Sequence, residues 1–139
     1  MDVYVDASVV LRVLGGEANA LPTWTAIDRP MSSELLRVEC LRSIDRARVR
    51  FGLMDTVVAE RRAAIIALLG TFALVPVSGA VLERASEPFP TAVGSLDAIH
   101  LATAVLLRDQ IEGLRLATHD LELGLAARSV GFEVDGLSV

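Results

Sequence analysis

Short apolar runs alternate with longer segments of helical periodicity along the whole of this 139-residue chain. The strand-like runs cover residues 3–5, 30–32, 72–75, 114–117 and 132–134. Strands that alternate with helices predict a parallel sheet with helices on both faces, because each crossover between parallel strands needs a helix. We therefore expect an α/β fold of three layers, α/β/α, around a central parallel sheet.

Seven segments carry helical periodicity or helix-boundary residues. They cover residues 7–14, 20–28, 33–51, 55–70, 79–85, 95–107 and 121–130. Hydroxyl and carboxylate side chains at helix starts predict N-caps at Ser33, at Asp55 or Thr56, and at Ser95. In the longest helix, 3.6-residue periodicity predicts a buried stripe made of Leu36, Cys40, Ile44, Ala47 and Phe51.

Length and composition predict one domain, residues 1–139, because 53% of the residues are apolar and no linker-like segment interrupts them. The single cysteine, Cys40, excludes an internal disulfide. No apolar run reaches the length of a membrane span, and the first residues lack the basic region of a signal peptide. We therefore expect a cytoplasmic protein without membrane association.

The formal net charge of -5 argues at first against a nucleic-acid partner. Net charge is a poor guide, however, where acids gather in a metal site and bases in a separate patch, because a bound cation reverses the local sign. All 13 basic residues are arginine. Arginine suits bidentate contacts with phosphate, although a biased base composition of the gene would produce the same pattern.

Three aspartates fall where a parallel sheet would collect functional groups. Asp6 ends the first predicted strand, and Asp120 follows the run 114–117. Carboxyl ends of parallel strands share one edge of the sheet, and sites form there where the strand order reverses. Asp97 lies in the first turn of an otherwise apolar helix. Taken one at a time, Asp6 and Asp120 are explained as helix N-caps and Asp97 by a favourable interaction with the helix dipole. Three acids at one edge of the sheet nevertheless favour a functional site.

Glu39 lies on the long predicted helix, on the same side as Arg42, Arg46 and Arg50. One interpretation is a solvated helix face with ordinary ion pairs. The other is a metal-binding glutamate beside arginines that bind a polyanion such as RNA. The pattern alone favours the first interpretation.

Four carboxylates drawn together repel one another unless they share protons or bind cations. An oxygen-only ligand set selects hard ions, Mg²⁺ or Mn²⁺. Such ions activate water and stabilise the charge that develops on a phosphodiester during hydrolysis. An aspartate after the first strand also occurs in haloacid-dehalogenase-like phosphatases and receiver domains, but both use a lysine, and this chain has none.

Four segments of the chain resemble, in order and spacing, the motifs of PIN-domain ribonucleases, and most closely the VapC-type toxins of toxin–antitoxin pairs. These segments are VYVDASVVLRVL, SSELLRVECLRSI, SLDAIHLATAVLL and LATHDLELGLAARSVGF. The resemblance spans essentially the whole chain. It implies a PIN-like fold and a Mg²⁺- or Mn²⁺-dependent endoribonuclease. It also implies that the catalytic, metal-binding quartet is Asp6, Glu39, Asp97 and Asp120, with Glu39 binding directly or through water.

The resemblance assigns supporting roles to neighbouring residues. Ser8 and Thr118 would orient a carboxylate or a water molecule, although local capping or turn bonds explain both equally well. His100 would serve in packing and hydrogen bonding and is not counted among the catalytic residues. His119 would lie beside the site.

The resemblance also implies partners. These are an RNA substrate, a second copy of the chain in a homodimer, and a cognate VapB-type antitoxin whose C-terminal segment approaches the active site. The predicted helix around residues 56–69 would supply part of an apolar groove for the antitoxin through Val57, Val58, Ile65 and Leu68. The alternative is a non-catalytic PIN-like module that binds RNA or protein.

Overall fold

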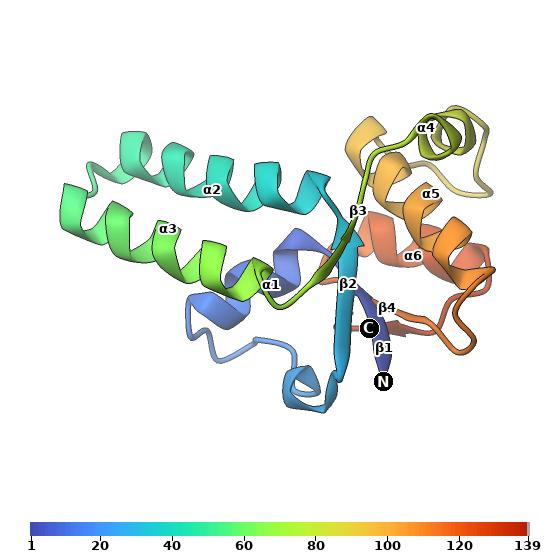
Figure 1. Ribbon diagram of the computed structural model, residues 1–139, viewed down its shortest axis with the longest axis horizontal. Helices are drawn as coiled ribbons and strands as arrows, with labels where there is room; N and C mark the ends of the chain where they lie inside the picture. Colours follow the sequence, from blue (N-terminus) through green and yellow to red (C-terminus); the bar gives the residue numbers. More distant parts are fainter. Residues whose placement is uncertain (139) are drawn as a thin grey trace.

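The computed structural model describes residues 1–138, and in them a parallel sheet of five strands lies between two layers of helices (Figure 1). The strand order is β3-β2-β1-β4-β5. The strands are β1 (Asp2–Val5), β2 (Arg29–Ser33), β3 (Ala73–Val75), β4 (Arg115–Ala117) and β5 (Val134–Asp135). Every pair of neighbouring strands is parallel. The prediction of a three-layer α/β/α fold is confirmed.

The strand order reverses beside the central strand. From β1 the chain passes to β2 and β3 on one side, and it then returns to β4 and β5 on the other. Val5 pairs with Ala117 across the reversal, and the backbone N–H of Asp6 donates a hydrogen bond to the carbonyl of Ala117 at 3.0 Å. The residues that follow β1 and β4 therefore emerge side by side, as the sequence predicts.

Helices cover both faces of the sheet. On one face lie α1 (Ala7–Leu14), α2 (Leu35–Phe51) and α3 (Asp55–Leu69), and on the other lie α5 (Ser95–Arg108) and α6 (Leu121–Ser129), with α4 (Gly79–Ala85) packed on α5 (Figure 1). Strand β1 serves both cores, because alternate side chains point to opposite faces. Val3 and Val5 pack toward α1–α3, whereas Tyr4 packs toward α5 and α6.

Helices α2 and α3 lie side by side and extend beyond the sheet as an arm, defined here as residues 35–69 (Figure 1). Because of this arm, the predicted buried stripe of α2 is wrong at its C-terminal end. Leu36, Cys40 and Ile44 are buried, but Ala47 is only half-buried and Phe51 is 67% exposed. The far end of α2 lies beyond the sheet, where it has only α3 to pack against.

Several predicted boundaries differ from the structure. The N-cap positions of α2, α3 and α5 are occupied by Glu34, Met54 and Gly94, not by the residues that we expected. Ser33 nevertheless accepts a hydrogen bond through Oγ from the backbone N–H of Leu35 at 3.1 Å. Asp55 and Ser95 become the first helical residues.

Two further elements are shorter or shifted. The helix predicted over 20–28 reduces to a single 3₁₀ turn, η1 (Trp24–Ala26). The last strand begins at Val134 rather than Phe132, since the N–H of Phe132 still bonds to the carbonyl of Ala127 at the exit of α6. In the part of the chain that the structure describes, no helix is both long and apolar enough to cross a membrane.

Candidate active site

Asp6 and Asp120 each follow a strand and cap the next helix. A side-chain oxygen of Asp6 accepts from the N–H of Ser8 at the start of α1, and Oδ1 of Asp120 accepts from the N–H of Leu123 at the start of α6, at 3.1 Å. The capping roles expected from the sequence are therefore present. Capping engages one oxygen of each carboxylate, and this leaves the second oxygen of each for another partner.

Within residues 1–138, the side chain of Asp6 accepts all its hydrogen bonds through one oxygen. Its Oδ2 accepts from Ser8 N (3.3 Å), from Ser8 Oγ (2.7 Å) and from Thr118 Oγ1 (2.9 Å). Within residues 1–138, Oδ1 accepts no hydrogen bond, although Asp6 is buried, with 6% exposure. Oδ1 is not one of the buried, unpartnered side-chain atoms of the described residues, so it remains open to a cation.

Ser8 and Thr118 also hold the two strand ends together. Ser8 Oγ accepts from the backbone N–H of His119 at 2.9 Å, and Thr118 Oγ1 accepts from the N–H of Asp120 at 3.0 Å. Each hydroxyl thus accepts from the chain that follows β4 and donates to Asp6. The structure places both residues beside Asp6, and it also contains the local turn bonds that we considered as their alternative role. Their supporting role stays a prediction.

Asp97 faces the other acids from the first turn of α5. Its pKa is raised from 3.8 to about 6, first by burial and then by the negative charges of Asp120 and Asp6, with a smaller contribution from Glu39; His100 opposes this rise. The charges of all three other carboxylates contribute to this pKa shift, so Asp97 lies within their electrostatic reach. Four acids from separate segments therefore gather at the reversal of strand order.

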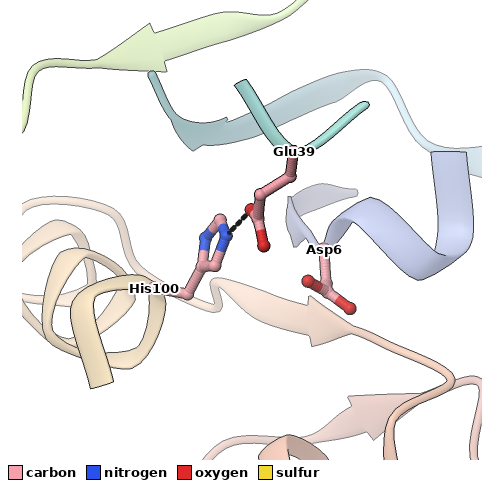
Figure 2. Close-up of side chains that lie close together, drawn as sticks. All are labelled: Asp6, Glu39 and His100. Atoms are coloured by element: carbon pink, nitrogen blue, oxygen red, sulfur yellow. Dashed lines mark hydrogen bonds and ion pairs between the residues drawn. The ribbon is translucent and has the colours of Figure 1, made fainter. Parts of the chain in front are cut away.

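Glu39 enters the cluster from α2 and contacts His100 of α5. Glu39 Oε1 and His100 Nε2 form a hydrogen bond, and Asp6 lies next to them (Figure 2). One ligand atom from each of Asp6, Glu39 and His100 lies within 4.8 Å of the other two. On the far side of the imidazole, His100 Nδ1 lies 2.6 Å from the hydroxyl of Tyr4.

The packing and hydrogen-bonding role expected of His100 is confirmed, but sequence reasoning did not find its two partners. Tyr4 reads as one residue of an apolar strand, and nothing in that pattern pairs it with a residue 96 positions away. One signal was available for His100, which lies one helical turn after Asp97 and so faces the same direction.

The three arginines that we expected on the Glu39 side of its helix lie on α2 and continue from Glu39 along the arm. Arg42, Arg46 and Arg50 are all exposed on α2, and Arg42 forms an ion pair with Asp45 at 2.9 Å. At 1.5 Å rise per residue, Arg46 and Arg50 are about 10 and 16 Å further along the helix axis than Glu39. The cluster and the arginines are therefore neighbouring but separate surfaces.

Comparison with known proteins agrees with this arrangement. The PIN domain family matches residues 3–128. A relative, Ribonuclease VapC46 of Mycobacterium tuberculosis, is 33% identical over 135 residues, which are 95% of this chain and 95% of that protein. A solved structure described as a toxin–antitoxin complex from Klebsiella pneumoniae has a TM-score of 0.64 at 20% identity, over 86% of this chain and 87% of its own, and supports the fold alone. The chain therefore belongs to the PIN-domain family and is similar over nearly its whole length to a VapC ribonuclease.

Proposed function

We propose that this chain is a metal-dependent endoribonuclease, the toxin of a VapBC-type toxin–antitoxin pair, that hydrolyses RNA phosphodiester bonds. The proposed catalytic residues are Asp6, Glu39, Asp97 and Asp120. The observation that carries the proposal is the convergence of these acids at the ends of β1 and β4, where burial first, and then the charges of Asp120 and Asp6, raise the pKa of Asp97 to about 6. Membership of the PIN-domain family and similarity to a named ribonuclease support it.

The residues present fit a hard divalent cation. The four acids offer only oxygen, which Mg²⁺ and Mn²⁺ prefer, and Oδ1 of buried Asp6 faces no protein donor among the described residues. Asp6, Asp97 and Asp120 would hold the ion directly, and Glu39 directly or through water. Once bound, the ion supplies the positive charge that polarises a phosphodiester and activates water.

Around this ion the protein supplies orientation. Ser8 and Thr118 bind Oδ2 of Asp6 and so fix the direction in which Oδ1 points. Asp97 and Asp120 lie at the first turn and the N-cap of two helices, where the backbone dipoles favour the ionised carboxylate. The hydrogen bonds to Asp6 and Asp120 would hold these two carboxylates in position before substrate arrives.

The arm provides a complementary surface for the RNA. It carries seven of the 13 arginines but only four of the 18 acids, so its formal charge is positive although that of the whole chain is negative. Arg42, Arg46 and Arg50 are the arginines that we propose for phosphate contacts, because guanidinium groups bind phosphate through paired hydrogen bonds. An RNA bound along α2 would reach the cluster at Glu39.

A groove of about 480 Å³ between α1, α2 and α3 supports the proposal of an antitoxin partner. Its apolar lining includes Leu11, Leu14, Ile44, Ala47 and Ile65. Of the four residues expected to form such a groove, only Ile65 lines it, whereas Val58 and Leu68 pack against the core. We propose that an apolar antitoxin segment binds there, that the toxin forms a homodimer, and that the pair acts in the cytoplasm, where its RNA substrate is found.

The test of the proposed function is cleavage of RNA by the purified, antitoxin-free chain with Mg²⁺ or Mn²⁺. Cleavage should stop in the presence of a chelator and should fall by roughly a hundredfold or more in Asp6→Asn and in Asp97→Asn, because each loses a charged ligand. The control is Asp109→Asn, an exposed acid at the other end of α5, which should cleave at the wild-type rate. Activity that survives both site substitutions would overturn the proposed site.

A further inference from the structure

His100 lies against the carboxylate cluster without being one of its four acids. One of its ring nitrogens and one oxygen each of Asp6 and Glu39 lie within 4.8 Å of one another. Distance alone would therefore allow His100 to serve as a metal ligand beside the two acids (Figure 2). The positions of the imidazole protons decide whether His100 can bind a metal itself or instead holds Glu39 in place.

Both ring nitrogens of His100 are already engaged. Nε2 contacts Oε1 of Glu39, and an ionised carboxylate only accepts hydrogen bonds, so Nε2 carries a proton. Nδ1 lies 2.6 Å from the hydroxyl oxygen of Tyr4, and that oxygen accepts from the backbone N–H of Ser33 at 3.2 Å. When the imidazole is neutral and carries its proton on Nε2, the hydroxyl of Tyr4 donates to Nδ1; when the imidazole is protonated, Nδ1 carries a proton of its own. Neither nitrogen retains a lone pair for a cation.

The partners of His100 anchor it to the sheet. Tyr4 belongs to the central strand β1 and Ser33 ends β2, and the side chains of Tyr4 and His100 are 0% exposed. Glu39 is different, because it lies on α2 and 21% of its side chain is exposed. A glutamate at such a position would otherwise sample several rotamers. The hydrogen bond from His100 holds Oε1 in place and leaves Oε2 for the cluster.

We propose that His100, fixed by the hydroxyl of Tyr4, is a positioning residue that aims Glu39 at the metal and keeps the ligand set oxygen-only. The inference rests on the proposed metal site and adds two residues to it. An oxygen-only set favours Mg²⁺ and Mn²⁺, whereas an available imidazole would favour ions such as Zn²⁺. Tyr4 thus contributes to metal selectivity from a position that touches no metal ligand.

The first test measures the Mn²⁺ affinity of the full chain by calorimetric titration. His100→Leu should weaken Mn²⁺ binding by about 10- to 100-fold, as is typical when the support of a ligand is lost. His100→Gln should recover most of that loss, because its amide N–H takes nearly the place of Nε2 and can donate to Glu39. The control is Leu101→Ala, a neighbour on α5 that is equally buried; it should lower thermal stability and leave Mn²⁺ affinity unchanged.

Two results would overturn the positioning role. One is wild-type Mn²⁺ affinity in His100→Leu. The other is a glutamine variant that binds Mn²⁺ as weakly as the leucine variant, since a direct nitrogen ligand predicts this outcome. If His100→Leu does not fold, His100→Asn takes its place, because its shorter amide cannot reach Glu39.

A second test addresses Tyr4. Tyr4→Phe removes the donor that holds Nδ1, so the proton of the imidazole can move from Nε2 to Nδ1. We expect the ratio of Zn²⁺ affinity to Mn²⁺ affinity to rise in this variant relative to the wild type. An unchanged ratio would contradict the part assigned to Tyr4.

RNA cleavage by the same proteins separates this inference from the proposed function. If the wild type and variants bind Mn²⁺ in the predicted order but no RNA is cleaved, the positioning role stands and the proposed function fails. If Mn²⁺-dependent cleavage is present but His100→Leu binds Mn²⁺ like the wild type, the proposed function stands and the positioning role fails.

Discussion

At the scale of single residues, the acids of the cluster differ in how much of their charge the protein itself satisfies. Asp6 and Asp120 accept hydrogen bonds at helix N-termini, and Glu39 accepts one from His100. Asp97 accepts none among residues 1–138 and has a pKa of about 6. Keeping Asp97 ionised at neutral pH without a cation therefore costs free energy.

Asp97→Asn should make the metal-free protein no less stable than the wild type at neutral pH. Because folding raises the pKa of Asp97 above 3.8, the folded state holds its proton more tightly, and stability falls as pH rises from about 4 through about 6. The advantage of the asparagine variant should therefore shrink below about pH 6. Thermal melts in the presence of a chelator across this range measure it.

Thermal melts of the same two proteins in the presence of Mn²⁺ test whether Asp97 binds the ion. The wild type should gain thermal stability from the ion because only the folded state assembles the site, and Asp97→Asn should gain much less. An equal shift in both proteins would exclude Asp97 as a ligand.

Burial makes the thiol of Cys40 unreactive. Burial first, and then the nearby charges of Glu39 and Asp6, raise the pKa of its thiol to about 12. Iodoacetamide should therefore leave Cys40 unmodified in the folded protein near pH 8 and modify it fully in concentrated guanidinium chloride. Mass spectrometry of the intact chain measures the extent of labelling under both conditions. Rapid labelling under native conditions would contradict the prediction and show that α2 opens.

At the scale of elements, the short strand β5 supports the site through the residue that follows it. Gly136 has a φ of +105°, and a Cβ there would lie 2.5 Å from the carbonyl oxygen of Thr118. Its own carbonyl accepts from Nδ1 of His119 at 2.8 Å. The backbone that presents Thr118 to Asp6 is therefore held in place by a close approach that only glycine permits.

Gly136→Ala should lower the free energy of unfolding by about 1–3 kcal/mol, because alanine adds both backbone strain and a backbone clash. It should also weaken Mn²⁺ binding, because Thr118 must shift. The control is Gly79→Ala at the start of α4, where a Cβ meets nothing within 4 Å; it should be neutral or slightly stabilising. Urea denaturation gives the stabilities, and equal midpoints for the two variants would contradict the argument.

At the scale of the whole molecule, charge is divided between two surfaces. The acids gather at the reversal of strand order, and the arm holds a surplus of arginine. A net charge of -5 therefore does not describe what an approaching polyanion meets. RNA would contact a positive arm first and an acidic cluster neutralised by its cation second.

Replacing Arg46 and Arg50 together by glutamine should weaken RNA binding and make it less salt-dependent. Loss of two phosphate contacts should lower the slope of log affinity against log salt by about 1.4 for single-stranded RNA. Binding is measured in the Asp6→Asn background, where cleavage is blocked. Arg128→Gln, an exposed arginine near the end of α6, is the control; the same change of slope in that variant would point to net charge instead of the arm.

The sequence by itself determined the alternation of strands and helices, the layer count, and the positions of Asp6 and Asp120 at strand ends. These features are local or topological: apolar periodicity defines the elements, and parallel connections force strand ends to one edge. The family resemblance added Glu39 and Asp97, which pattern alone explains as a solvated face and a helix-dipole acid. The assignment of one domain and the catalytic role of each residue stay predictions.

Only the tertiary structure decided how the acids are held. Phe51 is exposed because the arm extends beyond the sheet (Figure 1), and the periodicity of α2 does not reveal where the sheet ends. Tyr4, His100 and Glu39 come from β1, α5 and α2 and meet only after all three elements have packed. Helical and strand periods describe which side of its own element a residue occupies, but a hydrogen bond across 96 or 61 residues depends on packing between elements. The location of the carboxylate cluster was therefore predictable from the sequence, and the contacts that orient it were not.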